Sequence, residues 1–195
     1  MRVDNIKIGI VGLGYVGLPL AVEFSKKYQV KGFDTSKTRV NQLNNSIDET
    51  CEIDSKILDR TLDNGNILFS ENLDDLKDVN FYIITVPTPI DHNNNPDLKP
   101  LQNASLIVGQ VLKDGDIVVY ESTVFPGATE EICVPILEKE SGLVFNENFF
   151  CGYSPERINP GDKKHTLTDI VKITSGSTQF SATLINQVYS SIINA

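Results

Sequence analysis

A glycine-rich motif near the N-terminus has the spacing of a dinucleotide-binding turn. Residues Gly12 to Gly17 read GLGYVG, which fits GxGxxG; they follow the apolar run Ile6 to Val11 and open a second apolar stretch. In this context the first glycine permits a tight turn, the second lets the backbone approach a pyrophosphate, and the third allows a helix to pack closely on a strand. An ordinary strand-to-helix turn is the alternative. We predict that the motif binds a dinucleotide through Gly12, Gly14, Tyr15, Val16 and Gly17.

An acidic residue stands at the distance expected of a ribose-binding carboxylate. Asp34 follows the strand candidate Gln29 to Phe33 and lies 20 residues after Gly14. Such a carboxylate accepts a hydrogen bond from the 2′-hydroxyl of the adenosine ribose and repels the extra phosphate of NADP, so we predict NAD as the cofactor. Asp34 could instead cap the helix that begins near Lys37. Arg39 could cover the adenine or be a solvated cation on a helix face, and the sequence leaves both open.

Two later apolar runs end in hydroxyl-bearing residues. The sequence Val86-Pro87-Thr88-Pro89 ends one run and exposes Thr88, because proline cannot continue a strand. The sequence ESTVFPG, Glu121 to Gly127, ends the next run and contains Ser122 and Thr123. Ligands of open α/β sheets bind beyond the carboxyl ends of the strands, so these hydroxyls are expected at the ligand crevice. Capping of the following helices is the alternative interpretation.

A third strand end carries an acidic and a basic residue next to each other. Tyr153 to Asp162 read YSPERINPGD, in which Ser-Pro-Glu is typical of a helix start, while Pro160-Gly161 would stop a helix within a turn. A short, stiff turn then presents Glu156 and Arg157 beside the cofactor. A carboxylate there could act as a general base. An arginine there suits an anionic substrate.

Alternating strands and helices are needed to position these residues. The strand candidates are Ile6 to Val11, Gln29 to Phe33, Asn66 to Phe69, Phe81 to Val86, Ile117 to Glu121, Phe149 to Tyr153 and Ile170 to Ser175. The helix candidates are Val16 to Lys27, Lys37 to Asn44, Lys56 to Asn64, Leu101 to Leu112, Ala128 to Lys139 and Thr178 to Ile193. This alternation predicts a doubly wound, Rossmann-like α/β fold, with a mostly parallel sheet and helices on both faces. The polar stretch Asp91 to Asp97 is expected to be a surface loop.

Length and charge exclude several classes of protein. The 195 residues suit one large domain, and the formal net charge of −9 argues against a nucleic-acid partner, because phosphate neutralisation needs clustered Lys and Arg. No apolar run approaches the roughly 20 residues that a membrane helix needs. The N-terminus leads into the glycine motif rather than a signal-peptide cleavage site. We therefore expect a cytoplasmic protein that binds neither membrane nor nucleic acid.

The cysteines and histidines offer little material for a metal site. Cys51, Cys133 and Cys151 show no CxxC spacing, and His92 and His165 are the only histidines. A disulfide framework or a zinc cluster is not expected from this pattern. We predict no metal.

Four segments together resemble the UDP-glucose/GDP-mannose dehydrogenase family, and specifically its N-terminal NAD-binding domain. They are IVGLGYVGLPLA (Ile10 to Ala21), VPTP (Val86 to Pro89), ESTVFPGATEE (Glu121 to Glu131) and YSPERINPGD (Tyr153 to Asp162). The resemblance spans essentially the whole chain. It implies a full-length enzyme, expected to form a homodimer, that oxidises the C6 hydroxyl of a nucleotide sugar to a carboxylate in two successive NAD-dependent steps.

The resemblance also implies roles for individual residues. Thr88, Ser122 and Thr123 would lie along the cofactor, with Thr123 also near the reacting centre. Glu156 matches the family glutamate that assists hydrolysis of a covalent thioester. UDP-glucose enzymes commonly read PEFLxEG here, so Arg157 replaces Phe and Pro160 replaces the second glutamate, whose role cannot be carried over. The variant PERINPG resembles the branch acting on UDP-N-acetylhexosamines in capsule and surface-polysaccharide pathways.

Part of the family's machinery does not occur in this sequence. The family also uses a helix bearing Lys and Asn, and a nucleophilic Cys in a glycine-rich loop followed by Pro-Lys-Asp; neither is present among the 195 residues. The three cysteines are interpreted as packing or surface residues. Residues 1–195 are therefore expected to be the NAD-binding N-terminal domain of a longer enzyme, without its central helix and C-terminal substrate domain. A non-catalytic dinucleotide-binding or regulatory module, or a UDP-glucose or GDP-mannose dehydrogenase, remains the alternative.

Overall fold

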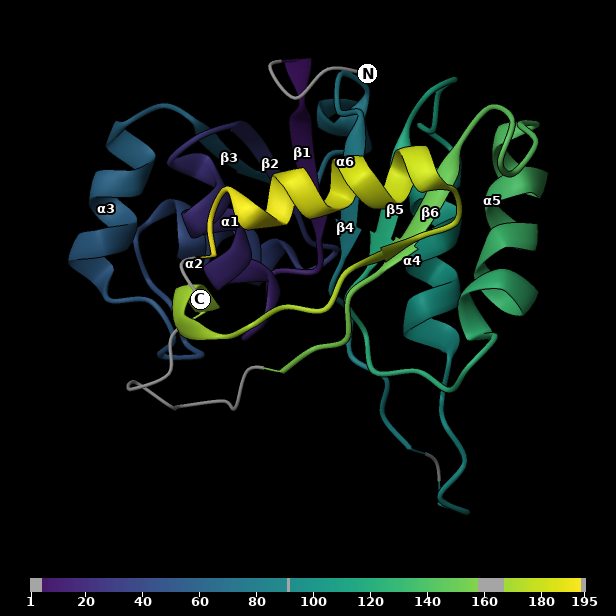
Figure 1. The fold of residues 1–195 in the computed structure, drawn as a ribbon. Coiled ribbons are helices and arrows are strands. Elements are labelled where there is room, and N and C mark those ends of the chain that lie inside the picture. Colours follow the sequence, from purple (N-terminus) through teal and green to yellow (C-terminus); the bar gives the residue numbers. More distant parts are fainter. Residues whose placement is uncertain (1–4, 91, 158–166, 194–195) are drawn as a thin grey trace.

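One sheet crosses the molecule in the computed structural model, which describes residues 5–90, 92–157 and 167–193 (Figure 1). In these residues seven strands are hydrogen-bonded in the order β3-β2-β1-β4-β5-β6-β7. The strands from β1 to β6 are parallel, and β7 runs antiparallel to β6. Their bounds are β1 Lys7–Val11, β2 Gln29–Phe33, β3 Ile67–Ser70, β4 Phe81–Ile84, β5 Ile117–Tyr120, β6 Phe150–Tyr153 and β7 Ser175–Gly176.

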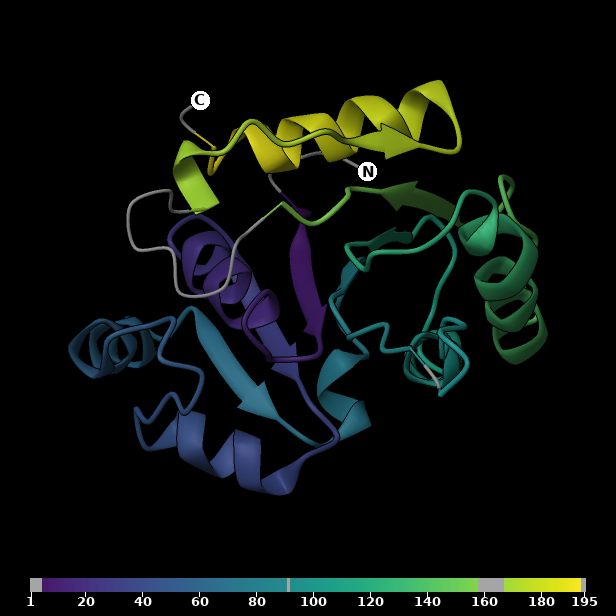
Figure 2. The ribbon, with the colours of Figure 1, turned by 90° about the horizontal axis from the view of Figure 1, so that it is seen from below.

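Helices cover both faces of this sheet. Figure 2 shows α1 and α6 on one side, with α4 and α5 on the other. None of the helices in the described part of the chain is long and apolar enough to cross a bilayer. The helices are α1 Gly17–Ser25, α2 Lys37–Asn44, α3 Ser55–Asp63, α4 Lys99–Gly109, α5 Val134–Ser141 and α6 Gln179–Ser190.

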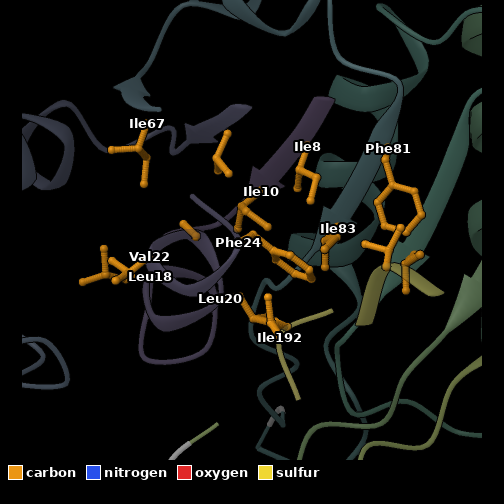
Figure 3. Packing of buried hydrophobic residues seen from close by; sticks show 14 of the residues in the cluster. Ile8, Ile10, Leu18, Leu20, Val22, Phe24, Ile67, Phe81, Ile83 and Ile192 are labelled. Atoms are coloured by element: carbon orange, nitrogen blue, oxygen red, sulfur yellow. The ribbon is translucent and has the colours of Figure 1, made fainter. Parts of the chain in front are cut away.

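The central strands are buried because both of their faces are covered. Each residue of β4 and of β5 is buried, as expected of parallel strands between two helical layers. Figure 3 shows Ile8 and Ile10 of β1 packing beside Leu20 and Phe24 of α1 in the core on one side. This packing fixes the glycine-rich turn, which joins β1 to α1, at the carboxyl edge of the sheet.

The predicted fold class is confirmed, with shifts at the ends of elements. The helix expected from Ala128 to Lys139 is divided into a π-helical turn, Thr129–Cys133, and α5. Pro135 lies in the first turn of α5 and has no N–H for an intrahelical bond, so a wider turn before it is physically reasonable. The helix expected from Leu101 begins earlier, at Lys99, with Pro100 in its first turn.

The strand predicted at Ile170 to Ser175 is wrong. A short 3₁₀ turn, Leu167–Asp169, precedes this segment, and the strand β7 comprises only Ser175–Gly176. Residues 171–174 make no ladder with β6, whose pairing with β7 is confined to Gly152 and Tyr153. The predicted surface loop is exposed at residues 92–96, and Asp91 lies outside the described residues.

Candidate functional site

A cavity of about 570 Å³ opens at the carboxyl ends of β1, β2, β4 and β5. It lies where the strand order reverses between β1 and β4, the position at which ligands of open α/β sheets bind. Among the described residues predicted for the site, Gly17, Arg39 and Arg157 lie outside the cavity lining. The predicted residues that do line it are Gly12, Gly14, Tyr15, Val16, Asp34, Thr88, Ser122, Thr123 and Glu156.

The three glycines of the motif occupy three different environments. Gly12 has a φ of +97°, which favours glycine, and its N–H donates to Phe33 O at 2.9 Å. A Cβ on Gly14 would meet no atom within 4 Å, so the backbone there is open to a ligand. A Cβ on Gly17 would lie only 1.9 Å from Gly12 O and 2.5 Å from Thr85 Oγ1. Each glycine therefore has the geometry that a dinucleotide-binding turn requires.

The Asp34 carboxylate is built into the glycine-rich turn. Its Oδ2 accepts from Leu13 N–H at 2.9 Å, and its Oδ1 accepts from Ser36 N–H at 2.9 Å. The helix-cap interpretation of Asp34 is wrong, because the N-cap of α2 is Ser36, whose hydroxyl accepts from Arg39 N–H. A carboxylate has about four lone-pair sites, so Asp34 can still accept from a ribose hydroxyl.

Arg39 is buried rather than solvated, which overturns one of its two interpretations. Its Nε donates to Leu13 O at 2.8 Å, and its Nη2 lies 2.8 Å from Asp48 Oδ1. Burial alone would raise the pKa of Asp48, but hydrogen bonds from Thr50, Ile53 and Arg39 outweigh it and hold that pKa below its usual value. Arg39 thus stabilises the glycine-rich turn through its bond to Leu13 O, and its contact with adenine stays a prediction.

The hydroxyls of Thr88 and Ser122 donate to backbone carbonyls in the segment that follows the neighbouring strand. Thr88 Oγ1 donates to Thr123 O at 2.6 Å, and Ser122 Oγ donates to Val86 O at 2.6 Å. The N-cap of the π-helical turn is Ala128, which makes no side-chain cap bond, so capping of that helix by Ser122 or Thr123 is not observed. These bonds fix the ends of β4 and β5 side by side along the cavity.

A buried ionic cluster lies at the far end of the cavity, formed by Glu121, Glu156 and Lys172. Lys172 Nζ donates to Glu121 Oε2 at 2.6 Å and lies 3.8 Å from Glu156 Oε2. The side chains of the lysine and of the two glutamates are 3%, 0% and 8% exposed in the order Lys172, Glu121, Glu156. Glu156 Oε1 also accepts from Arg157 N–H at 2.6 Å. A carboxylate and its counter-charge therefore stand at the wall of the cavity.

Burial dominates the electrostatics of this cluster. It raises the pKa of Glu121 to about 7, although the charge and hydrogen bond of Lys172 lower it. Burial, followed by the charge of Glu121, also raises the pKa of Tyr189, which comes from α6. Lys172 is therefore the main group that favours the charged form of Glu121 against the effect of burial.

Several residues at or behind the cavity wall were not assigned to the site from the sequence, among them Thr85, Lys99, Glu121 and Lys172. Thr85 Oγ1 donates to Gly12 O at 2.7 Å and closes the glycine-rich turn from β4, and Lys99 lines the cavity at the start of α4. Glu121 is the first residue of the ESTVFPG motif, where the sequence pointed only to the hydroxyl residues that follow it. Lys172 was hidden in an apparent strand, where a single charge between Val171 and Ile173 was the available signal.

Arg157 is directed toward the chain rather than into the cavity. It is exposed, and its Nη1 donates to Val171 O at 3.0 Å. A guanidinium has five N–H donors, so this contact leaves donors for a ligand, and substrate binding by Arg157 stays a prediction. Pro160, which contributed to the predicted sugar preference, lies outside the described residues.

The three cysteines, all within the described residues, do not line the cavity. Cys133 and Cys151 are buried, and burial raises the pKa of both thiols. Cys51 is exposed in a turn with a φ of 58°. A nucleophilic cysteine needs a thiolate, which burial disfavours, so the packing and surface interpretations are physically consistent.

The donor set of the cavity fits a dinucleotide. Gly14 leaves room for a pyrophosphate at the start of α1, where backbone N–H groups favour an anion. Val11, Phe33 and Ile107 supply apolar surface for a flat base. The Asp34 carboxylate lies beside them as an acceptor for ribose.

Known proteins resemble the chain over nearly its whole length. Residues 6–193 match the UDP-glucose/GDP-mannose dehydrogenase family, NAD binding domain. A UDP-N-acetyl-D-glucosamine 6-dehydrogenase from Pseudomonas aeruginosa is 57% identical over 191 residues, which are 98% of this chain and 44% of that protein. Protein CapL from Staphylococcus aureus is 54% identical over 98% of this chain and 44% of its own length. The chain thus spans less than half the length of these relatives.

A solved structure gives the same result in three dimensions. The UDP-D-ManNAc dehydrogenase from Pyrococcus horikoshii superposes with a TM-score of 0.90 at 33% identity. The match covers 97% of this chain and 46% of that one.

Proposed function

Because the chain belongs to the UDP-glucose/GDP-mannose dehydrogenase family, we propose that it is the NAD-binding half of a nucleotide-sugar 6-dehydrogenase. The full enzyme would convert the C6 hydroxyl of a UDP-sugar to a carboxylate, consuming two NAD and one water and forming two NADH and three protons. One observation carries this proposal. Glu156 lines the same cavity as Gly12 and Gly14, so a carboxylate stands where a dinucleotide and a substrate would meet.

The chain's own residues divide the work of binding. Gly14 and the start of α1 would hold the pyrophosphate, and Asp34 would accept from the adenosine ribose. Thr88, Ser122 and Thr123 would lie along the nicotinamide half, on the strand ends that their hydrogen bonds fix. When bound, the nicotinamide supplies the hydride acceptor.

Glu156 would act after the hydride transfers, by accepting a proton from the water that hydrolyses a thioester. A general base has to be ionised and within hydrogen-bond reach of that water. The thioester would form on a cysteine beyond these 195 residues, since the cysteines of this chain lie away from the cavity. We therefore propose that the chain alone binds NAD and oxidises no sugar.

The proposed sugar is a UDP-N-acetylhexosamine. Support comes from the relative in Pseudomonas aeruginosa, which is a UDP-N-acetyl-D-glucosamine 6-dehydrogenase, and from the PERINPG sequence around Glu156. A nucleotide-linked uronic acid is a building block for surface polysaccharide, which is the proposed use of the product. The homodimer and the cytoplasmic location stay predictions from the sequence.

Steady-state kinetics of the full-length protein test this function. UDP-N-acetylglucosamine should give a higher kcat/KM than UDP-glucose or GDP-mannose, because differential binding of the transition state sets the ratio. A preference for UDP-glucose or GDP-mannose would correct the substrate and keep the enzyme class. NAD binding without oxidation of any nucleotide sugar would instead favour the non-catalytic module.

A further inference from the structure

An inward-facing lysine interrupts an otherwise outward-facing apolar segment beside the cavity. Val171 and Ile173 are 61% and 56% exposed, whereas the Lys172 side chain between them is 3% exposed. A segment packed for stability alone would direct its apolar side chains inward and its charge outward. The reversed pattern indicates that the charge itself is needed inside.

The surroundings of Lys172 show what the charge faces. Its Nζ donates to Glu121 Oε2 from the end of β5 and lies 3.8 Å from Glu156 Oε2 in the turn after β6. The Tyr189 hydroxyl of α6 belongs to the same buried group, since the charges of Glu121 and Glu156 both act on it. Two buried carboxylates thus share one ammonium ion.

The distances assign different roles to the two carboxylates. A separation of 2.6 Å is a charge-assisted hydrogen bond, whereas 3.8 Å is an electrostatic contact without a hydrogen bond. Glu121 therefore fixes Lys172 in place, while Glu156 is attracted by the ammonium without a direct hydrogen bond to it. Glu156 is also the carboxylate closer to solvent in this cluster.

The backbone around the cluster is fastened at both ends. Arg157 Nη1 donates to Val171 O at 3.0 Å, which ties the Glu156 turn to the Lys172 segment. Ser175 Oγ donates to Tyr153 O at 3.1 Å on the other side. Lys172 and Glu156 are thus held in register by bonds that do not involve their own side chains.

We propose that Lys172 is a positioning residue, which holds the Glu156 carboxylate at the cavity wall and is itself fixed by Glu121. The inference rests on the proposed function, in which Glu156 accepts a proton from water. Lys172 does not line the cavity, so it acts through Glu156 and touches neither substrate nor cofactor.

Substitutions of Lys172 and Glu121 test this proposal in the full-length enzyme. Lys172→Met should lower kcat by roughly tenfold to a hundredfold, the scale for a displaced reacting group, and leave KM for NAD nearly unchanged. In the pH profile of kcat, the acid limb of Lys172→Met should move to higher pH, because loss of a nearby cation disfavours the charged form of the Glu156 carboxyl. Glu121→Gln keeps the Lys172 charge but removes the carboxylate that fixes Nζ, and should lower kcat as well. Lys172→Arg keeps the charge and should recover part of kcat.

A double variant separates positioning from stability. Lys172→Met leaves two buried carboxylates without a cation, and adding Glu121→Gln relieves their repulsion, so the double variant should unfold at a higher temperature than Lys172→Met. Its kcat should stay low. Recovery of kcat together with stability would make the cluster purely structural and overturn the proposal. If Lys172→Met does not fold, the double variant carries the kinetic test.

Glu156→Gln, measured in parallel, distinguishes the two levels of the account. If Glu156→Gln is inactive while Lys172→Met keeps a normal kcat and a normal pH profile, the role of Lys172 is refuted and the proposed function stands. Near-normal kcat in Glu156→Gln would refute the role of Glu156 and the inference with it.

Discussion

The Asp34 carboxylate is expected to select the cofactor and also stabilises the glycine-rich turn. Its carboxylate accepts from Leu13 N–H and Ser36 N–H while it lines the cavity. These bonds orient the carboxylate before a ligand arrives, which lowers the entropic cost of binding a ribose.

Replacement of Asp34 should therefore weaken NAD and narrow the preference over NADP. Asp34→Asn keeps an acceptor and the size of the side chain but removes the charge that repels a 2′-phosphate. Loss of a charged hydrogen bond, about 1.5 to 3 kcal/mol, corresponds to roughly tenfold to a hundredfold in affinity. Isothermal calorimetry measures the affinity of both proteins for NAD and for NADP. Equal affinity of the unmodified chain for NAD and NADP would show that Asp34 does not select.

Glu156 should matter for turnover rather than for cofactor binding. In the full-length enzyme, Glu156→Gln removes the base and should lower kcat by about 10²-fold or more, the usual scale for a positioned acid or base. The affinity for NAD should change little, because the base acts after the cofactor has bound. Stopped-flow and steady-state NADH absorbance, with calorimetry as the control, separate these effects. A variant with normal kcat would reduce Glu156 to a turn residue.

At the residue scale, local motifs were predictable and long-range partners were not. Gly12, Gly14, Asp34 and Glu156 stand in motifs that were recognised from their spacing or sequence, and the structure brings these residues to one cavity. Lys172 acquires its position through long-range contacts such as that with Glu121, from which it is 51 residues distant in sequence. The burial of Arg39 likewise depends on Asp48, whose loop has no signature of its own.

The β1-turn-α1 element depends on the absence of a side chain at Gly17. Gly17→Ala would place a methyl group 1.9 Å from Gly12 O, so the helix would have to move away from the strand. We expect the chain to lose about 1 to 3 kcal/mol of stability, the usual cost of overpacking, and its affinity for NAD. Thermal unfolding and calorimetry measure the two losses.

Gly14→Ala is the matched control for this prediction. Its Cβ would meet nothing within 4 Å, so the unfolding temperature should stay close to that of the unmodified chain while NAD affinity falls. Gly17→Ala with normal stability and normal affinity would contradict the assigned packing role.

The turn before β5 should make stability depend on pH. Burial raises the pKa of Asp116 to about 6 from its ordinary 3.8, even though Lys113 N–H donates to it at 2.9 Å. The folded state then binds more protons than the unfolded state between these values, so the stability contribution is present below about pH 4 and is lost as pH rises to about 6. With increasing pH the unmodified chain should lose up to about 3 kcal/mol of unfolding free energy through this group, and Asp116→Asn should abolish that loss. Denaturant unfolding of both proteins at pH 4 and pH 7 measures it; parallel pH profiles would contradict it.

Element identity was predictable where hydrophobic periodicity was strong, and less so elsewhere. The runs that became β4 and β5 are apolar at each position and were assigned correctly within a residue or two. The segment Ile170 to Ser175 is also rich in β-branched residues, but only Ser175 of it pairs in the sheet, and Val171 O accepts from the Arg157 side chain. The π-helical turn before α5 reflects a proline in a helical pattern, which shifts hydrogen bonds without ending the helical course.

The whole molecule combines a net charge of −9 with a site for an anionic dinucleotide. Backbone N–H groups at a helix start can hold a phosphate whatever the total charge, so the two features are compatible. The cavity is walled by strand ends and by the start of α4. Relatives are more than twice as long as this chain, and the proposed reaction needs a nucleophile that these 195 residues do not place at the cavity.

The stoichiometry of NADH tests the central claim most directly. A limiting amount of UDP-N-acetylglucosamine is incubated with excess NAD and either the full-length protein or the 195-residue chain. The full-length protein should form two NADH per sugar and a uronic acid product, because the aldehyde stage is carried on to the carboxylate, whereas the chain alone should bind NAD and form no NADH. One NADH per sugar, no NADH from the full-length protein, or sustained NADH from the chain alone would contradict the account.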